Sequence, residues 1–446
     1  MVSEHASGAG VSGGADIAVI GGGLAGLAAA WALGREHRVT LYERHGQPGF
    51  TASSVRLPVT VAAGVDASLR IDVPLRVFYP GYYPTLLALY AELGVKTEPI
   101  SYATSFSGAD GQVFFRYYNL LVAEQAFGMV SPVQMLKPVF RQVALGAWRF
   151  RRALHAAHQA RDLGQLTLGE FVTQERFDPA FVDGLMLPMV CTIATCSAEQ
   201  ALAYPADVVA QYLLRGVTRQ AVRRAQRGAD DVAQRLMQRV SHAHFHADLR
   251  ELSLHDHGVS VLHADGRRTQ HQHVVLATNA RQACALLAPA QAAERRLLGQ
   301  VQHSSVEVVV HRDAAVMPRQ RQDWSPVNAA VWPGQQQAMT SIWLNRVQPA
   351  LRSSSPVFQT VAPALAIRED CIIGRARFER PVVTLQSRGL EQRVAALHAQ
   401  AGRRIWLCGS YAGEGVPLLE SAVSSAQSAA RSLQAEWLRS RALNSA

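Results

Sequence analysis

The sequence contains very little lysine and few cysteines. Only Lys96 and Lys137 are lysine, so arginine supplies nearly all of the positive charge in this chain of 446 residues, whose formal net charge is +10. The five cysteines are scattered, and the one close pair, Cys191 and Cys196, lacks the C-x-x-C spacing of a zinc or iron–sulfur site. We therefore expect no metal site, and we expect free thiols in a reducing, cytoplasmic compartment.

The chain also lacks an uninterrupted apolar run long enough to cross a bilayer. The stretch 17–33 comes nearest, but its glycines divide it into a strand and a helix. Residues 1–15 form a Gly/Ser/Ala tail without the basic region of a secretory signal. Hydrophobic residues make up 48% and charged residues 17% of the chain, which excludes a disordered protein, and the length predicts two connected domains.

The excess of arginine fits nucleic acid, an anionic membrane or an ordinary solvated surface. No basic motif interleaved with aromatic residues is present, so we expect no nucleic-acid partner. The segment Phe140–Arg161 shows a basic amphipathic pattern, with an apolar face of Val143, Ala147, Phe150 and Leu154 and an opposite face of Arg141, Arg149 and Arg152. Such a helix either packs its apolar face into the protein or lies on anionic lipid, so a peripheral contact with the inner face of the membrane stays open.

A glycine-rich turn follows the first predicted strand. Residues 16–20 have the short, β-branched pattern of a buried parallel strand, and residues 24–33 follow as a helix. In the G-x-G-x-x-G between them, Gly21 permits a tight turn, Gly23 lets backbone approach a pyrophosphate, and Gly26 allows close packing of helix and strand. The next predicted strand ends at Glu43, about 20 residues later, where a carboxylate can bind ribose hydroxyls. The pattern predicts a dinucleotide site at the N-terminus of the helix.

A second strand, glycine and helix close the chain. Residues 404–409 are predicted as a strand that ends in Gly409, and residues 418–433 open a helix of small residues. A second helix N-terminus beside a dinucleotide site would face the pyrimidine of a flavin, where negative charge collects on reduction. We interpret the two motifs together as an FAD site.

These two motifs, with the hairpin signal Ala264-Asp265-Gly266 and the strand 273–278, resemble the flavin-containing amine oxidase and phytoene desaturase superfamily. The resemblance covers nearly the whole chain after the tail. It is nearest to a branch of predicted NAD/FAD-binding oxidoreductases linked to cyclopropane fatty-acid synthase genes, through segments such as 71–78 and 343–348. It implies an α/β fold: a discontinuous Rossmann-like FAD-binding domain, residues 16–90, 225–290 and 395–438, with an inserted α+β substrate domain. The insert would comprise a mainly helical part, 91–224, and a sheet, 291–394, and the tails would be 1–15 and 439–446.

The resemblance also assigns residues to a non-covalently bound FAD. The pyrophosphate would be held by Gly21, Gly23, Leu24, Ala25 and Gly26. The adenosine would contact Glu43, Arg44, Ala277, Thr278 and backbone groups of Val240. The pyrophosphate or ribityl chain would meet Gly409 and Ser410, and the isoalloxazine would meet Leu418 and Leu419, with residues 73–76 running beside the ring.

Three features of the superfamily are absent. Its Gly-Gly-Arg is replaced by Pro48-Gly49-Phe50-Thr51, and either Arg56 or Arg76 could supply the missing cation. Neither lysine lies in a strand of the region where many amine oxidases place a lysine near the flavin, and Leu418 occupies a position of the aromatic amine cage. These departures leave FAD binding unaffected and weaken amine oxidation.

We therefore predict an FAD-dependent oxidoreductase that removes a hydride from a C–H bond of a small apolar organic substrate, such as an unsaturated lipid or a hydrophobic metabolite. The electrons would pass to O2 or a quinone. Two alternatives stay open: an amine or amino-acid oxidase with an atypical active site, and a non-catalytic FAD-bound scaffold. The candidate catalytic residues are Arg76, Trp343 and Tyr82, the last from an aromatic cluster, 78–83, that either lines a substrate pocket or belongs to the core.

Overall fold

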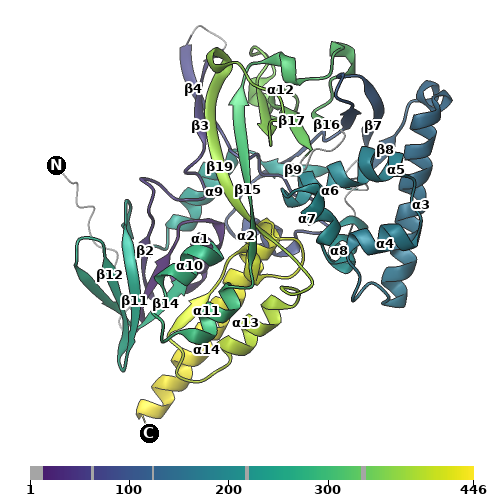
Figure 1. Ribbon diagram of the computed structural model, residues 1–446. Helices are drawn as coiled ribbons and strands as arrows, with labels where there is room; N and C mark the ends of the chain where they lie inside the picture. The colour runs from purple at the N-terminus through teal and green to yellow at the C-terminus, as the bar shows by residue number, and fades with distance from the viewer. Residues whose placement is uncertain (1–13, 62–64, 123–124, 216–219, 333–337, 446) are drawn as a thin grey trace.

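The computed structural model describes residues 14–61, 65–122, 125–215, 220–332 and 338–445. Figure 1 shows a region built on a parallel sheet at the bottom of the view, a large sheet above it, and a group of helices at the right. The expected N-terminal tail lies almost wholly outside the described residues.

The lower region is built on a parallel sheet of five strands in the order β10-β2-β1-β14-β20. Ile20 at the end of β1 pairs with both Tyr42 and Leu276, and Leu276 pairs with Leu407. The carboxyl ends of neighbouring strands therefore meet at one edge, which is where α/β sheets bind ligands. The strands are β10 (His242–His244), β2 (Arg38–Tyr42), β1 (Asp16–Ile20), β14 (His273–Leu276) and β20 (Ile405–Leu407).

Both faces of this sheet are covered, and its central strands β1, β14 and β20 are apolar and buried along most of their length. Ile17 and Val19 of β1 share a core with α1 and α14, which pack against each other, whereas Ala18 and Ile20 share a core with α10 and α13 on the other face. The covering helices are α1 (Leu24–Leu33), α9 (Gly228–Met237), α10 (Ala280–Leu286), α11 (Ala292–Leu298), α13 (Leu390–His398) and α14 (Leu419–Ser445). The βαβ unit expected at the start of the chain is confirmed.

An antiparallel sheet flanks the parallel one. It consists of β11 (Leu249–His255), β12 (Gly258–His263) and β13 (Arg268–His271). The hairpin expected at residues 264–266 joins β12 to β13, and Gly266 adopts a left-handed φ of +84° there.

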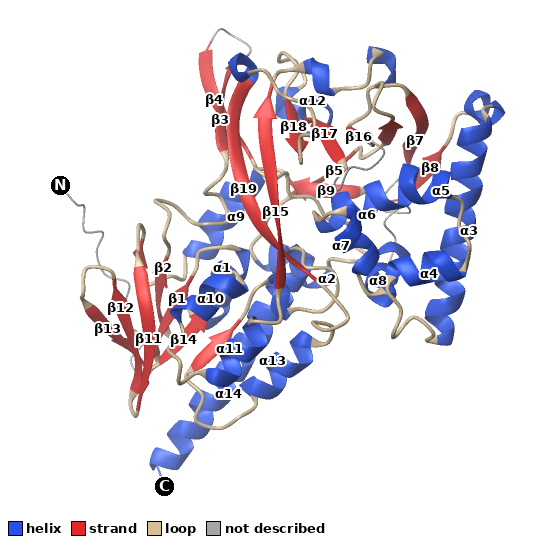
Figure 2. Cartoon of the chain, viewed as in Figure 1, coloured by secondary structure: helices blue, strands red, loops and turns tan. Residues whose placement is uncertain are grey.

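The upper region centres on an eight-stranded sheet in the order β19-β15-β18-β17-β16-β6-β7-β8 (Figure 2). Its long strands β15 (Gln302–His311) and β19 (Ile372–Val382) reach down toward the parallel sheet. The others are β18 (Phe358–Val361), β17 (Met339–Trp343), β16 (Val327–Ala330), β6 (Thr104–Ser107), β7 (Val113–Val122) and β8 (Gln125–Met129), with α12 (Leu344–Val347) after β17. Two further strand pairs are β3 (Val55–Val61) with β4 (Val65–Ile71), and β5 (Thr97–Ile100) with β9 (Val222–Ala225).

Helices gather beside the β7–β8 end of this sheet. They are α3 (Pro138–Ala160), α4 (Leu168–Gln174), α5 (Pro179–Phe181), α6 (Leu187–Ala194), α7 (Ala198–Ala203) and α8 (Ala206–Leu214). The sequence predicted a mainly helical part over residues 91–224, and the described residues between Thr97 and Met129 differ from this prediction, because they form mainly strands. The predicted C-terminal tail is also helical, since α14 runs to Ser445. In the described part of the chain, none of the helices is both long and apolar enough to span a bilayer.

Candidate functional site

The first half of the site is the turn between β1 and α1, which we call the N-terminal cradle (residues 21–26). Gly21 has a φ of +104°, and a Cβ there would lie 3.0 Å from the carbonyl of Ala277. A Cβ on Gly26 would overlap the Gly21 carbonyl oxygen, whereas a Cβ on Gly23 would meet no atom within 4 Å. No side chain caps the N-terminus of α1. Open space in front of uncapped helix amides is the arrangement that binds a phosphate.

Glu43 follows β2 and is buried beside this cradle. Its carboxylate accepts hydrogen bonds from the backbone N–H of Gly22 at 2.6 Å and of His45 at 2.9 Å. These bonds hold the carboxylate against the glycine turn, on the strand where a carboxylate can bind ribose hydroxyls. Arg44 beside it is exposed, and its guanidinium donates to the His45 ring.

The second half is the segment between β20 and α14, which we call the C-terminal cradle (residues 409–419). Gly409 has a φ of +149°, its N–H donates to the Ser425 hydroxyl at 3.1 Å, and Ser410 follows it. Leu418 and Leu419 lead into α14 and are partly buried.

Ala277 and Thr278, directly after β14, join the two cradles. Ala277 and Thr278 both border Gly21, and the carbonyl oxygen of Thr278 lies 3.6 Å from the Cβ position of Gly409. Segments more than 380 residues apart in the sequence therefore meet because β14 lies between β1 and β20. The structure thus brings together the expected cofactor residues of both ends of the chain.

Val240, predicted to contact adenine, is the exception, because the structure does not bring it to the cradles. Val240 precedes β10, and His242 pairs with Thr40 while His244 pairs with Tyr42. Because β10 runs parallel to β2, Val240 lies at the amino edge of the sheet, opposite the edge that holds Glu43. The backbone beside Glu43 belongs to the residues after β10, since the Glu43 N–H donates to the His244 carbonyl and the Ala247 N–H donates to the Glu43 carbonyl.

The structure decides between the two arginines that could replace the missing Gly-Gly-Arg. Arg56 is exposed on β3, whereas the Arg76 guanidinium lies 4.2 Å from the centre of the Phe50 ring and donates to the Phe50 carbonyl. Phe50 is itself tied to the N-terminal cradle, because its N–H donates to the Gly22 carbonyl at 2.9 Å. Burial lowers the pKa of Arg76 below its usual value. Arg76 thus places a half-buried cation next to the cradle.

Arg380 is a site residue that the sequence analysis missed. It lies on β19 opposite Ser304, its Nε is fully buried without a hydrogen-bond partner, and no ion pair among the described residues includes it. Tyr204, Arg76 and Tyr83 are charged or titratable groups close to it. Burial lowers the pKa of Arg380, and the charge of Arg76 acts in the same direction. Two partly buried guanidiniums favour an anionic or electron-rich ligand, and the carboxylates of Asp72 and Asp230 offset part of the charge of Arg76.

Tyr82 belongs to a buried cluster of tyrosines beside the C-terminal cradle. Its hydroxyl accepts a hydrogen bond from the Val416 N–H at 2.8 Å, and its ring packs edge-on against Tyr212 with centroids 4.7 Å apart. Burial raises the pKa of Tyr82 to about 12, so the phenol stays protonated at neutral pH. The aromatic residues Phe78, Tyr79, Tyr82 and Tyr83 are all buried in the main core.

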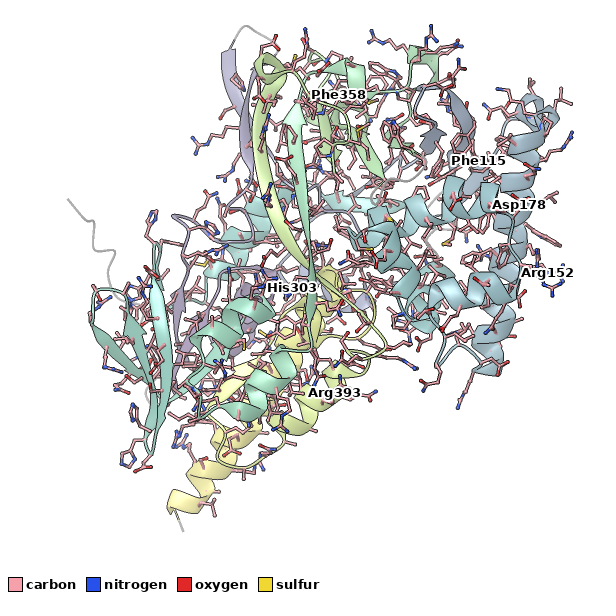
Figure 3. The ribbon with its side chains drawn as sticks, in the orientation of Figure 1. Phe115, Arg152, Asp178, His303, Phe358 and Arg393 are labelled. Atoms are coloured by element: carbon pink, nitrogen blue, oxygen red, sulfur yellow. The ribbon has the colours of Figure 1, made fainter. Side chains whose placement is uncertain are left out.

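Trp343 is not brought to the cradles. It packs edge-on against Trp324, with centroids 5.4 Å apart, and Trp324 packs against Phe358. Phe358 lies at the top of the large sheet in Figure 3, far from α1 and α14. Of the three candidate catalytic residues, Arg76 and Tyr82 therefore border the cradles and Trp343 does not.

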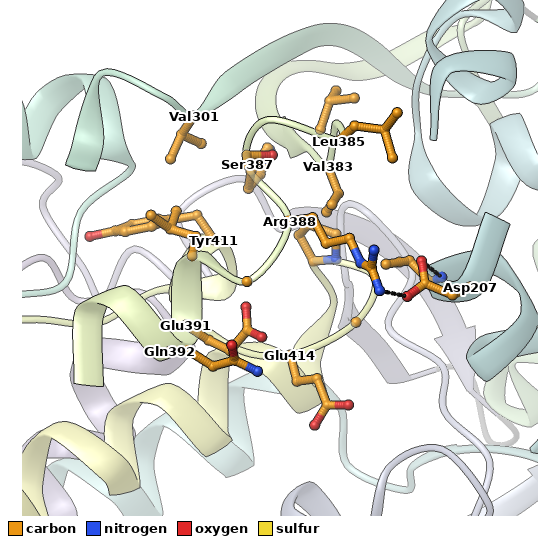
Figure 4. Close-up of a pocket in the computed structure, with 18 of the residues that line it drawn as sticks. Asp207, Val301, Val383, Leu385, Ser387, Arg388, Glu391, Gln392, Tyr411 and Glu414 are labelled. Atoms are coloured by element: carbon orange, nitrogen blue, oxygen red, sulfur yellow. Dashed lines mark hydrogen bonds and ion pairs between the residues drawn. The ribbon is translucent and has the colours of Figure 1, made fainter. Parts of the chain in front are cut away.

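A pocket of about 610 Å³ opens beside the C-terminal cradle (Figure 4). Tyr411, Gly413 and Gly415 form one wall, the end of β19 (Pro381, Val382) forms another, and α8 contributes Asp207. Arg388 closes one side through an ion pair with Asp207 at 2.7 Å. Glu391 and Glu414 also line it, and the pKa of Glu391 is raised, chiefly by burial and further by the charge of Glu414.

These residues fit an FAD molecule. The open position at Gly23, the uncapped α1 N-terminus, the buried Glu43 carboxylate and the Arg76 cation supply what phosphate and ribose groups require. Cys408, the cysteine nearest the C-terminal cradle in sequence, is fully buried, and burial raises the pKa of its thiol to about 12. In the described ranges, no group of three or more His, Cys, Asp or Glu side chains is placed to hold a metal ion.

Comparison with known proteins agrees with this arrangement. Residues 19–93 match the family described as NAD(P)-binding Rossmann-like domain. No curated protein matches the chain at a significant level. A solved structure of a putrescine oxidase variant is 16% identical, with a TM-score of 0.62 over 94% of this chain and 99% of that one.

Two further solved structures have similar scores. Cyclohexylamine oxidase from Brevibacterium oxydans is 15% identical, with a TM-score of 0.62 over 95% of this chain and 99% of that one. A fatty acid isomerase from P. acnes that produces CLA is 17% identical, with a TM-score of 0.60 over 95% of this chain and 99% of that one. The chain therefore has the α/β fold of these solved structures along nearly its whole length, which confirms the predicted fold class.

Proposed function

We propose that the chain is an FAD-dependent oxidoreductase that binds its cofactor non-covalently across the two cradles and oxidises a C–H bond of an apolar organic substrate. The observation that carries this proposal is the junction of Gly21 and Gly409 through Ala277 and Thr278. It provides two helix N-termini at one edge of one sheet, which suits a long molecule with phosphates in its middle and an electron-rich ring at its end. Bound FAD would supply the acceptor for a hydride, and O2 or a quinone would take up the electrons afterwards.

The protein's own residues would bind and orient the reactants. The amides of α1 would hold the pyrophosphate, Glu43 the ribose, and Arg76 would balance negative charge beside the N-terminal cradle. Arg380 would stabilise negative charge that develops on reduction, because it is enclosed and has no carboxylate partner. Tyr82 and the tyrosines around it would exclude water from this region, since all of them are buried and protonated.

An apolar substrate is favoured by the surroundings of the C-terminal cradle. Val382 and Val383 lie where β19 approaches the pocket, and Leu418 lies at the start of α14. A neighbour of the same fold is a fatty acid isomerase, which acts on an apolar chain. The cytoplasmic face of the membrane would be the natural source of such a substrate.

Amine oxidation is the second candidate, and one observation favours it. Glu391 and Glu414 place two carboxylates in the pocket, and Asp207 adds a third that is paired with Arg388. Carboxylates attract a cationic amine. Two of the neighbours with this fold are a putrescine oxidase and a cyclohexylamine oxidase.

Anaerobic reduction of the purified, FAD-loaded protein separates the candidates. We expect loss of the visible flavin absorbance with unsaturated lipids or other apolar donors, and no change with primary or secondary amines. Reduction by amines alone, with hydrogen peroxide released on admission of air, would contradict the first candidate and support the second. A flavin that dithionite reduces but no donor does would support the non-catalytic scaffold.

A further inference from the structure

The exposed large apolar side chains of the protein are concentrated in one short part of the chain. Twelve of the 17 found among the described residues lie between residues 118 and 148. We call them the outer apolar surface: Tyr118, Leu120, Val122, Phe127, Met129, Val130, Val133, Met135, Leu136, Val139, Leu145 and Trp148. They belong to β7, β8, the short connection after β8 with its 3₁₀ turn Pro132–Leu136, and the first half of α3. A soluble monomer rarely leaves so many neighbouring apolar side chains in water.

The strand pair β7–β8 shows one apolar face to solvent. Tyr118 pairs with Met129 and Leu120 pairs with Phe127, so these four side chains point to the same side. All four are exposed, whereas Ala126 on the other side is buried. The face is therefore left uncovered by the fold, although most apolar strand faces pack on a core.

Helix α3 extends the outer apolar surface. The face of α3 that reaches solvent is not the apolar face of its amphipathic sequence pattern. Val143, Phe150 and Leu154, the apolar face of the amphipathic pattern, are buried in the main core together with Phe140. The face that reaches solvent carries Leu145, which is 64% exposed, and Trp148, which is 59% exposed. Figure 3 shows Arg152, one turn after Trp148, on the outward side of α3. A lipid contact through Val143 and Phe150 is thus excluded, and a contact through Leu145 and Trp148 takes its place.

Charge identifies the kind of partner. Residues 111–161 contain seven basic residues and one acidic residue. Two of the arginines lie over aromatic members of the surface, Arg116 at 4.4 Å from the Tyr118 ring and Arg152 at 4.7 Å from the Trp148 ring. Aromatic and long cationic side chains alternate in this way where a protein meets the headgroups and the first carbons of a bilayer.

We propose that the outer apolar surface docks the protein onto an anionic lipid bilayer. Val133 and Leu136, which are 72% and 75% exposed, enter the acyl region with Leu145 and Trp148, and the arginines remain among the phosphates. A second copy of the chain is a poorer occupant, because a symmetric contact would bring the same seven positive charges against each other. Docking in this way does not depend on the proposed reaction, but it would place the protein where apolar substrates dissolve.

Co-sedimentation of the full-length, FAD-loaded protein with vesicles tests this proposal. We expect binding to vesicles that contain phosphatidylglycerol, much weaker binding to pure phosphatidylcholine, and loss of most of the difference in about 0.5 M salt, where charges are strongly screened. The double variant Leu136→Gln/Trp148→Gln should bind phosphatidylglycerol vesicles about tenfold more weakly. The control Leu254→Gln/Leu438→Gln removes two exposed apolar side chains elsewhere, 43% and 53% exposed, and should bind as the natural protein does.

Two further measurements complete the test. Brominated lipid should quench tryptophan fluorescence of the natural protein, and Trp148→Phe should remove that quenching. The variant Arg141→Gln/Arg152→Gln should lose the preference for phosphatidylglycerol. Equal binding of Leu136→Gln/Trp148→Gln and of its control to the vesicles would overturn the proposal. A natural protein that stays in solution with both kinds of vesicle would also overturn it. If the natural protein is a dimer that does not bind vesicles, and Leu136→Gln/Trp148→Gln is a monomer, then a second copy covers the outer apolar surface instead.

Discussion

The cradle edge of the parallel sheet and the outer apolar surface expose opposite kinds of group. At the cradles, apolar side chains such as Ile17, Val19 and Leu27 are buried, and the backbone of the glycine turns is what remains open. At the outer apolar surface, the backbone of β7 and β8 is paired, and the side chains remain open. Free amides suit a phosphate, and free apolar side chains suit a lipid. The difference shows that one fold can present two partners with two separate kinds of surface.

The substitution Gly23→Val, at the N-terminal cradle, is expected to have the largest effect, which is a loss of FAD binding. A Cβ at this position meets no protein atom within 4 Å, so the fold should persist, but the side chain fills the space in front of the α1 amides. We expect FAD affinity to fall by at least about 100-fold, since the charge-assisted contacts to the pyrophosphate are lost. Bound flavin per mole of purified protein measures this. Gly128→Val on β8 is the matched control, because a Cβ added at Gly128 also meets no atom within 4 Å. This variant should retain its full content of flavin.

The two sides of the segment around α3 should differ sharply in their contribution to stability. Phe140→Ala empties a fully buried position and should lower the free energy of unfolding by about 3–5 kcal/mol. Leu136→Gln, four residues earlier on the outer apolar surface, should change it by less than about 0.5 kcal/mol. Denaturant titration gives both values. A large loss of unfolding free energy in Leu136→Gln would show that Leu136 packs against the protein, and it would contradict the view of this surface as uncovered.

Replacement of Arg380 should raise the stability of the cofactor-free protein, whereas replacement of Arg224 should lower it. Arg380 has no partner, so Arg380→Met should stabilise the cofactor-free protein while making the midpoint potential of the bound flavin more negative by about 30 mV, a tenfold change for a two-electron couple. Arg224 is paired with Glu98 at 2.8 Å, so Arg224→Met should cost about 3–5 kcal/mol and leave the potential unchanged. Thermal unfolding and anaerobic redox titration measure the two quantities. A destabilised Arg380→Met variant with an unchanged potential would make Arg380 a structural residue.

Substitution of Glu391 should give the smallest change in stability, and this change should depend on pH. Its pKa is raised in the folded protein, so the ionised carboxylate costs stability above that pKa, and the cost disappears below the ordinary glutamate pKa of about 4.3. Glu391→Gln should therefore stabilise the protein at pH 7 and have no effect near pH 4. Unfolding midpoints at the two pH values check the sign, and a loss of stability at pH 7 would contradict it.

The local parts of the site could be predicted from the sequence, and the parts set by distant pairing could not. The positions of Gly21, Gly23, Gly26 and Glu43 follow from a strand, a turn and a helix that are consecutive in the chain. Val240 was misplaced because its position depends on the register of β10 against β2, which the residues near Val240 do not encode. No pattern in the sequence revealed how the sheet order would place it.

Two other misjudgements have physical reasons. Arg380 was missed because Arg375, Arg377 and Glu379 are exposed along the same strand, and the sequence around them resembles an ordinary solvated edge. Residues 91–224 were predicted to be mainly helical, yet the pairing of β7 with β8 overrides local helix propensity in residues 113–122 and 125–129. The alternation of Tyr118, Leu120 and Val122 was the signal that could have identified the strand.

The most direct test of the account is the visible spectrum of the purified protein, with the mass of the cofactor released on denaturation. The account predicts a yellow protein that releases intact FAD in an amount close to one per chain, and a colourless but folded Gly23→Val variant. A natural protein that is folded by circular dichroism, carries no flavin and takes up none from added FAD would contradict it.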